Sequence, residues 1–172
     1  LFDGMAAPVL YASATQVNAV APWALAGRGQ TAVQVEYGGI RSAAMQVSVG
    51  AASPAVFPGA VLNRDYSVNS AANGAAKGSY VLLYATGGGV MSPAAFDGSF
   101  AAAPYATLPA GAVAAQVGGL DATIGYAGDA PGFVTGAMQI NVQIPAAAPS
   151  GSVAVTLRMN GVGAPPLAVW VK

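Results

Sequence analysis

Four oxygen-bearing side chains alternate in the middle of the chain, at Asn63, Asp65, Ser67 and Asn69. Carboxylate, amide and hydroxyl oxygens are the ligands that calcium prefers, so this spacing resembles part of a calcium-binding loop. The segment lacks the glycine and the distal glutamate of such a loop. The same alternation describes the solvent face of a β-hairpin whose other face carries Leu62 and Val68. The hairpin interpretation is favoured, and these four residues are the candidate metal ligands.

Acid–base catalysis would need two carboxylates that converge in one cleft. The chain has six, at Asp3, Glu36, Asp65, Asp97, Asp121 and Asp129. Asp97, Asp121 and Asp129 lie in turn-like sequences, where an aspartate side chain accepts hydrogen bonds from nearby backbone. We therefore expect turn formation, not catalysis, from these three.

The sequence gives little support for nucleophilic catalysis or thiol chemistry, because the chain contains no histidine and no cysteine. It lacks the usual base near neutral pH, the commonest transition-metal ligand and any disulfide. Lys77 and Ser79 could share a strand face as a Ser-Lys dyad, but an ordinary strand start is favoured. The glycine run Gly87–Gly89 lacks the lysine and serine of a phosphate-binding loop, so a bulge or loop is expected. The sequence predicts no enzyme, no catalytic residue and no cofactor.

Two further groups of side chains have a functional and a structural interpretation. Five aromatic residues could form a stacking platform for a sugar or peptide, namely Trp23, Tyr37, Tyr66, Tyr105 and Trp170. Core packing is expected for most of them. The amides of Gln16 and Asn18 lie on one strand face in a motif that recurs later, and we expect them to be buried at a domain junction.

The composition excludes several classes of partner. Charged residues make up 7% of the chain and hydrophobic residues 55%, whereas an ordinary soluble domain is about 25% charged. Six basic and six acidic residues give zero net charge, which argues against nucleic acid or an anionic membrane as a partner. The apolar residues are largely alanine, and no stretch approaches the ~20 large apolar residues of a membrane-spanning helix. We expect no membrane insertion.

Short runs rich in Val, Ile, Tyr and Thr recur about every 8–12 residues between glycine, proline, asparagine and serine, which is typical of an all-β sandwich or barrel. Residues 32–37 and 152–157 alternate apolar and polar side chains, as half-buried strands do. Prolines and glycines interrupt almost every window of helical length. The sequence therefore predicts an all-β fold.

An internal repeat organises these strands. QVNAVAP at residues 16–22 recurs as QINVQIP at residues 139–145, and each copy is followed by a turn and an alternating strand. After that strand Tyr37-Gly38-Gly39 matches Met159-Asn160-Gly161, which predicts a two-residue hairpin turn with positive φ. Further matches keep the same order, namely Phe2-Asp3-Gly4 with Val117-Gly118-Gly119, Tyr11-Ala12 with Tyr126-Ala127, and Val47-Ser48-Val49 with Val169-Trp170-Val171.

The repeat predicts two tandem immunoglobulin-like β-sandwich units. The second, residues 77–172, has the roughly 100 residues of such a domain. The first, residues 1–52, starts where the second is already half way through, so it lacks its opening strands. Residues 53–76 are expected to form a linker or hairpin. The missing strands would come from an upstream part of a longer precursor, from residues 53–70, or from another chain.

Several segments together resemble the uncharacterised C-terminal domain family that is expanded in soil acidobacteria. They are YASATQVNAVAP, AVLNRDYSVNSAANGAAKGS, LYATGGG, YAGDAPGFVTGAMQINVQIP and PSGSVAVTLRMNG. The resemblance covers nearly the whole chain and implies an IPT/TIG-like immunoglobulin fold at the C-terminal end of secreted or surface proteins, with no known activity. The family usually has more residues before Phe2, and often a glycine where this chain has Tyr66.

These observations predict a non-enzymatic structural, spacer or adhesion-type module of a secreted or cell-surface bacterial protein. Two alternatives stay open, a carbohydrate- or peptide-binding module and a subunit of a surface fibre assembled by strand complementation. The expected partners are other domains of the same longer polypeptide, a protein or glycan at the cell surface, or further copies of the chain. The chain begins at Leu1, and we expect a processed product or a fragment.

Overall fold

The computed structural model describes residues 1–172, and it is all-β with several antiparallel sheets, so the prediction of an all-β fold is confirmed. The only helical segment is one 3-10 turn, η1 (Trp23–Leu25). No helix has the length and apolarity that a membrane crossing requires.

Two sheets form the C-terminal part of the molecule. One has the strand order β11-β12-β8-β7, from β11 (Ile124–Asp129), β12 (Met138–Gln143), β8 (Tyr80–Thr86) and β7 (Ala55–Asn63). The other has the order β10-β9-β13, with both β14 and β15 paired to β13. Its strands are β10 (Leu120–Ala122), β9 (Val113–Val117), β13 (Gly151–Met159), β14 (Val162–Gly163) and β15 (Leu167–Val171).

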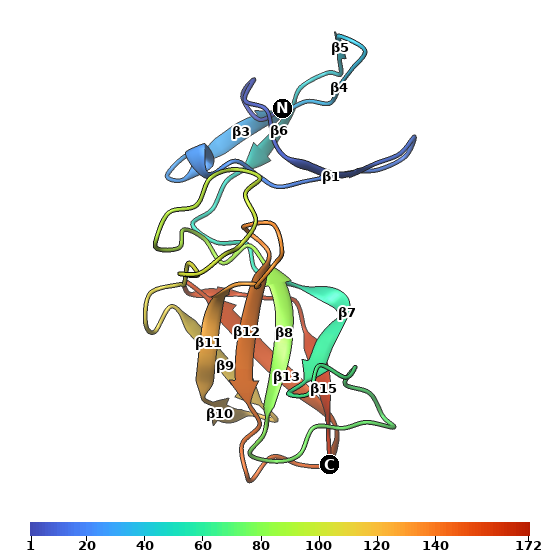
Figure 1. The fold of residues 1–172 in the computed structure, drawn as a ribbon, viewed down its shortest axis with the longest axis vertical. Coiled ribbons are helices and arrows are strands. Elements are labelled where there is room, and N and C mark those ends of the chain that lie inside the picture. Colours follow the sequence, from blue (N-terminus) through green and yellow to red (C-terminus); the bar gives the residue numbers. More distant parts are fainter.

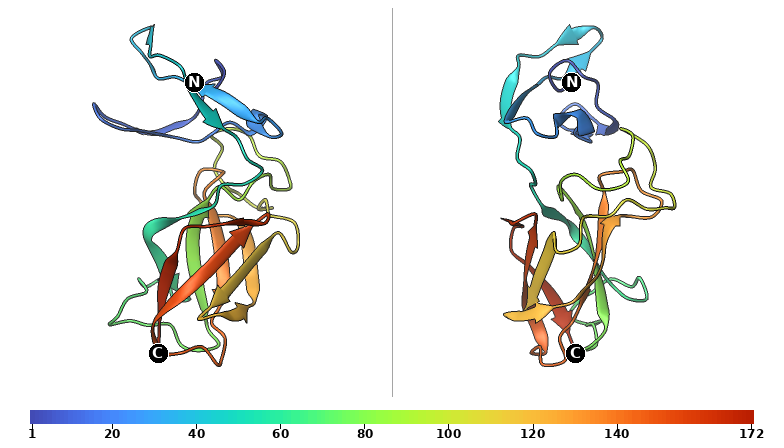
Figure 2. Two further views of the ribbon diagram at one scale, coloured as in Figure 1. Left: turned by 180° about the vertical axis from the view of Figure 1, so that it is seen from behind. Right: turned by 90° about the vertical axis from the view of Figure 1, so that its left-hand side faces the viewer.

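The two sheets lie face to face as a sandwich, seen edge-on in the right-hand view of Figure 2. Apolar side chains from both sheets form one continuous core between them. The largest fully buried side chains are Leu83, Met138, Ile140, Ile144, Leu157 and Met159. β13 shows why the sequence folds this way, because its residues alternate between buried and exposed along its length, as period-two patterning requires.

β7 differs from the predicted division of the chain. Residues 53–76 were expected to form a linker or hairpin, with 53–70 available to complete the first unit, but β7 pairs with β8 and extends the C-terminal sheet. The register shifts between Val56 and Val61. Pro58 lies inside this bulge, and proline cannot donate a ladder hydrogen bond, so it is tolerated at a bulge of an edge strand. The sandwich therefore begins near residue 55, not residue 77.

The N-terminal part, residues 1–49, consists of three short two-stranded ribbons. They are β1 (Val9–Ala12) with β2 (Val17–Ala19), β3 (Gln30–Val33) with β6 (Met45–Ser48), and β4 (Glu36–Tyr37) with β5 (Ile40–Arg41). We call this set the N-terminal ladder. It lies at the opposite end of the molecule from the C-terminus (Figure 1). The strand predicted over residues 32–37 is divided between β3 and β4.

A hydrogen bond and an aromatic side chain help to join the ladder to the sandwich. The backbone N–H of Trp23 donates to Oδ1 of Asp97 at 2.9 Å. The Trp23 side chain packs against the sandwich core. The 3-10 turn thus anchors the ladder on the loop around Asp97.

Candidate functional site: the N-terminal ladder

The four candidate metal ligands lie on a hairpin that begins at the end of β7, so the predicted hairpin is present. Its faces differ from the prediction, because Asn63 is buried and Val68 is exposed. Asn63 and Tyr66 flank a turn, with Tyr66 N–H donating to Asn63 O at 2.9 Å, and Leu62 bridges Val68. Ser67 donates to Oδ1 of Asp65 from its hydroxyl at 2.5 Å and its backbone N–H at 3.0 Å. These two bonds lower the pKa of Asp65.

Asn63 and Asn69 extend this network to the last strand of the sandwich. Nδ2 of Asn69 donates to Oδ1 of Asn63 and to Trp170 O, both at 2.9 Å, and Trp170 N–H donates to Oδ1 of Asn69 at 2.7 Å. The amide oxygens thus accept hydrogen bonds from the protein and tie the hairpin to β15. Calcium binding at these residues stays the disfavoured alternative to the hairpin interpretation.

Three of the six carboxylates have partners of their own. Asp3 pairs with Arg28 at 3.0 Å and Glu36 with Arg41 at 2.7 Å. Asp121 lies in β10, where Oδ1 accepts from Gln116 Nε2 at 2.9 Å. No group of three or more acidic side chains is placed to hold a metal ion.

Asp129 is buried, with 3% of its surface exposed, at the end of β11. The turn interpretation was therefore wrong for Asp129, as it was for Asp121. The backbone N–H of Ala106 donates to Oδ2 of Asp129 at 3.3 Å. Burial raises the pKa of this carboxyl above its ordinary value, because a charged group loses hydration inside the protein.

Lys77 and Ser79 lie just before β8, and the glycine run Gly87–Gly89 lies just after it. The Ser79 hydroxyl donates to Ala76 O at 2.6 Å in the turn before β8. Gly87 has φ +76°, and a Cβ there would lie 1.9 Å from Ser53 O. The run Gly87–Gly89 is a loop, as predicted, and its lack of side chains lets the connecting segment 51–54 pass close to it.

The expectation that most of the five aromatic residues pack in the core was wrong. Four are exposed, with Tyr37 at 88%, Tyr66 at 65% and Tyr105 and Trp170 at 38%. They lie on four separate segments, and the one close aromatic pair of the structure is Tyr84 with Phe133 at 5.6 Å. The exposed rings thus form no common stacking platform.

The repeated amide motif makes the same hydrogen bond in both copies. Nε2 of Gln16 donates to Oδ1 of Asn18 at 2.7 Å, and Nε2 of Gln139 donates to Oδ1 of Asn141 at 2.8 Å. Gln16 and Asn18 are exposed, so the expected burial at a domain junction was wrong for this copy. The amides brace their own strand.

The recurrence extends to the register of every ribbon in the N-terminal ladder. β1 pairs with β2 through Tyr11↔Asn18 and Ala12↔Val17, and β11 pairs with β12 through Tyr126↔Asn141 and Ala127↔Ile140, with a bulge one step before in both. β3–β6 and β13–β15 agree likewise, as Thr31↔Val47 and Val153↔Val169 illustrate. The ribbon Tyr37↔Ile40 matches Met159↔Val162, and the bridge Phe2↔Val33 matches Val117↔Val155.

Glycine-containing turns explain why the local pairings agree. Gly38 and Gly39 have φ +58° and +77°, and Asn160 and Gly161 have φ +47° and +80°. Two successive positive φ values define the type I′ turn, which fixes the register of a two-residue hairpin. The predicted hairpin turns are therefore confirmed.

The two copies differ in what covers them. β12 lies between β11 and β8, and β13 lies between β9 and β15. In the ladder β2 pairs with β1 alone, and β3 pairs with β6 and has only the bridge to Phe2 on its other edge. Val17 is 43% exposed where Ile140 is 0%, and Tyr37 is 88% exposed where Met159 is 0%. The buried residues of the ladder are Pro22, Leu25 and Thr31. Its exposed large apolar residues are Val9, Leu10, Tyr11, Val17, Val35, Tyr37, Ile40, Met45 and Val47.

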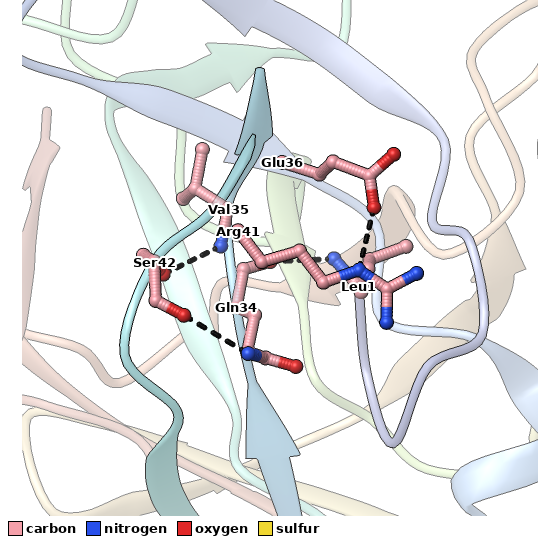
Figure 3. Close-up of polar contacts among 6 residues, drawn as sticks. All are labelled: Leu1, Gln34, Val35, Glu36, Arg41 and Ser42. Carbon is pink, nitrogen blue, oxygen red and sulfur yellow. Dashed lines mark hydrogen bonds and ion pairs between the residues drawn. The ribbon is translucent and has the colours of Figure 1, made fainter. Parts of the chain in front are cut away.

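Polar contacts hold the two edges of the strand end around Gln34 and Val35 (Figure 3). On one edge the N-terminal amine of Leu1 donates to Gln34 O at 2.7 Å, and Gln34 N–H donates to Leu1 O at 3.0 Å. This contact corresponds to the pairing of Gln116 with Thr156 between β9 and β13. On the other edge Ser42 N–H donates to Val35 O at 2.9 Å, as Ala164 N–H donates to Leu157 O in the sandwich, and the hydroxyl of Ser42 accepts from Val35 N–H at 3.0 Å.

A small cavity of about 200 Å³ lies where the 3-10 turn meets the sandwich loops. Trp23, Val90, Met91 and Pro93 are among its mostly apolar lining residues. Ligand pockets for small molecules usually measure about 300–1,000 Å³ and contain convergent polar groups. The exposed N-terminal ladder is therefore the stronger candidate for a functional surface.

Two features could not be predicted from individual residues, namely the hydrogen bond of Asp97 with Trp23 and the exposure of the apolar residues of the ladder. Asp97 was interpreted as a turn residue, and nothing in its local sequence indicates that it accepts a hydrogen bond from Trp23. The apolar exposure of the ladder does have a sequence signal, namely a repeat whose first copy lacks counterparts of β7 and β8.

Comparisons with protein-family models, with curated proteins and with solved structures found no match.

Proposed function

We propose that this chain is a non-enzymatic structural, spacer or adhesion-type module of a secreted or cell-surface protein, built from two tandem immunoglobulin-like units of the IPT/TIG kind. The recurrence of the strand register between residues 2–48 and 117–170 is the observation that carries the proposal. A repeated β unit with dispersed carboxylates suits mechanical linkage or surface presentation better than catalysis.

Strand order supports the immunoglobulin-like assignment. An immunoglobulin domain has strands A, B, E and D in one sheet and C, F and G in the other, with C′ added beside C in some types. The orders β7-β8-β12-β11 and β10-β9-β13-β15 match A-B-E-D and C′-C-F-G. In the same terms the N-terminal ladder contains counterparts of strands D, E, F and G.

The elongated arrangement suits a spacer, because the chain termini lie at opposite ends of the long axis (Figure 1). A module that connects other domains of one polypeptide transmits tension between its ends. The C-terminal sandwich has a continuous core, so it should unfold cooperatively under such tension.

Single-molecule stretching of the full chain between its termini tests this role. We expect one cooperative unfolding event whose contour length matches residues 55–171, while the N-terminal ladder extends without a resolved peak. Leu157→Ala should lower the unfolding force, and Val35→Ala at the equivalent exposed position should not. A chain that extends without any cooperative event would contradict a spacer role.

The adhesion-type role makes a separate prediction, namely saturable binding to a cell-surface glycan or protein. An array of glycans and extracellular proteins, probed with the intact chain at up to millimolar concentration, measures this. Uniformly negative arrays would restrict the proposal to the spacer role.

A further inference from the structure

The loop at residues 87–112, between β8 and β9, brings the sandwich into contact with the N-terminal ladder. In the right-hand view of Figure 2 the covalent connection between the two regions runs down one side, and this loop meets the ladder on the other side. A single flexible connection lets two domains pivot about it, whereas a second attachment away from it fixes their relative orientation. The loop contact is therefore the part of the molecule that can set the angle between the two regions.

The ladder contributes its 3-10 turn, η1, to this contact. The Trp23 ring is half-buried and packs against the sandwich core. Trp23 and Ala26 line one small apolar cavity together with Val90, Met91 and residues 93–95. The indole Nε1–H is buried without an acceptor, so the contact of this side chain depends on the apolar surface of its ring and not on a hydrogen bond.

Asp97 supplies the polar part of the contact. The first backbone N–H groups of a helical turn have no partner inside the turn, and the side chain of the preceding residue commonly caps them. Here Pro22 precedes the turn, and no side-chain cap is made at that position. Oδ1 of Asp97 accepts from Trp23 N–H at 2.9 Å instead. Asp97 is also the only charged residue in the loop 87–112, so the turn is capped by a carboxylate from the other region.

Two glycines lie against the ladder beside this contact. A Cβ on Gly98 would lie 3.1 Å from Cγ of Pro8, and a Cβ on Gly136 would lie 3.3 Å from Cγ1 of Val20. Gly136 belongs to the loop between β11 and β12, so two loops of the sandwich approach the ladder. The contact is thus a small surface and not a single bond.

The repeat shows which residue of the turn is specific to this contact. A backbone N–H donates to the carbonyl three residues earlier in both copies, to Pro22 O at 3.1 Å and to Pro145 O at 3.0 Å. The residue after the proline is Trp23 in the first copy and Ala146 in the second. Ala146 is exposed, whereas Trp23 packs against the other region. The turn is common to the repeat, and the aromatic side chain is specific to the copy that makes the contact.

We propose that residues 90–97 of the sandwich form a docking surface for the 3-10 turn of the adjoining immunoglobulin-like unit, and that Trp23 is the residue that this surface recognises. Asp97 caps the docked turn, and the contact holds the two units at one angle. The inference deepens the proposed spacer role, on whose two-unit arrangement it rests, by naming the contact that makes the spacer stiff. A turn with alanine in this position, as in the second copy, lacks the ring that the surface binds.

The distance between two spin labels, one on each region, tests the proposal in the full chain. The chain contains no cysteine, so Gln46→Cys in β6 and Thr156→Cys in β13 provide exposed labelling sites. We expect double electron–electron resonance to give a single narrow distance distribution. Trp23→Ala should widen it at least about twofold, because the two regions then pivot about their covalent connection. Trp23→Phe should keep it narrow, since phenylalanine retains an aromatic ring.

The cap is tested by a second pair of variants. Asp97→Ala removes the acceptor and should widen the distribution, whereas Asp97→Asn keeps a carbonyl oxygen that accepts from the same N–H and should preserve the narrow distribution. Trp170→Ala is the control, because it removes the other tryptophan of the chain, near the C-terminus and far from the ladder. A cooperative urea transition shows that the sandwich of each variant is folded.

Three results would overturn the proposal. A broad distribution in the labelled parent chain would show that the two units are not held at one angle. An unchanged distribution in Trp23→Ala would show that the ring does not hold them. Equal widening by Asp97→Asn and Asp97→Ala would contradict the cap. Each of these results leaves the cooperative unfolding of the sandwich under tension, and hence the spacer role, standing.

Discussion

Val35 and Leu157 occupy equivalent positions in two ladders of the same register, yet Val35 is 49% exposed and Leu157 is 1% exposed. Local sequence explains the shared register, because turn glycines and alternation act within each hairpin. Burial depends on strands that come from elsewhere in the chain, and only the C-terminal copy has β7, β8 and a full β9 beside it. The comparison teaches that the strand pairing of this repeat can form even where its apolar side chains are not buried in a core.

The largest expected effect comes from shortening these two equivalent side chains. Leu157→Ala should lower the free energy of unfolding of the sandwich by about 2–5 kcal/mol, because it leaves a cavity in a packed core. Val35→Ala should change it by less than about 0.5 kcal/mol, as exposed substitutions usually do. Urea denaturation measures both values. A comparable loss in the two variants would mean that the ladder is as well covered as the sandwich.

The connection between the two regions can be tested at Gly87. Gly87→Ala should lower the free energy of unfolding by about 2–4 kcal/mol. The alanine would be strained at this positive φ, and its Cβ would clash with the Ser53 backbone, so the chain would have to shift. Gly132 has φ +77° and no atom near the site of a Cβ, so Gly132→Ala measures the strain alone and should cost about 1–2 kcal/mol. Equal losses in thermal or urea unfolding would show that segment 51–54 is not held against Gly87.

The two regions should respond to pH with opposite signs. Burial raises the pKa of Asp129 in the sandwich, so the folded state binds its proton more tightly and stability falls as pH rises from the ordinary aspartate pKa through the raised one. The backbone N–H of Ala32 lowers the pKa of Asp3 in the ladder, so its contribution is lost as pH falls through that lowered pKa.

Asp129→Asn should remove the first dependence and Asp3→Asn the second, measured as urea midpoints across the acid range. The Asp3 effect should be the smaller, because its carboxylate is exposed. A steeper fall of stability with rising pH in Asp129→Asn would contradict the assigned sign.

The smallest expected effect lies in the hairpin after β7. Tyr66 has φ +64° and is 65% exposed. Tyr66→Gly should raise the free energy of unfolding by about 0.5–1 kcal/mol. The substitution relieves the left-handed strain of a non-glycine residue, and the greater chain entropy of glycine in the unfolded state offsets part of this gain. A loss of stability would show that the tyrosine ring makes a contact that outweighs its backbone strain.

The features that were predictable from sequence depend on neighbours along the chain. The strand over residues 152–157 and the turn at Gly38-Gly39 follow from alternation and from positive φ, and both are confirmed. The repeat also indicated which counterparts the first copy lacks.

The features that were not predictable depend on what lies opposite in space. Residues 53–76 were expected to form a linker or hairpin, but residues 55–63 form the edge strand β7, with a bulge around Pro58. Asp129 has a turn-like sequence but is buried by the loop around Ala106. Tyr37 is exposed because its ribbon, β4 with β5, has no further strand beside it. No local sequence pattern indicates this.

Hydrogen exchange at two equivalent amides tests the central comparison most directly. Asp3 N–H donates to Ala32 O at 2.8 Å, and Gly118 N–H donates to Ala154 O at 2.9 Å. The two bonds are matched in geometry and differ in the structure around them. We expect the Gly118 amide to exchange only through global unfolding and the Asp3 amide to exchange through local opening, at least about a hundredfold faster. Equal protection of the two amides would contradict the conclusion that the N-terminal ladder lacks a core of its own.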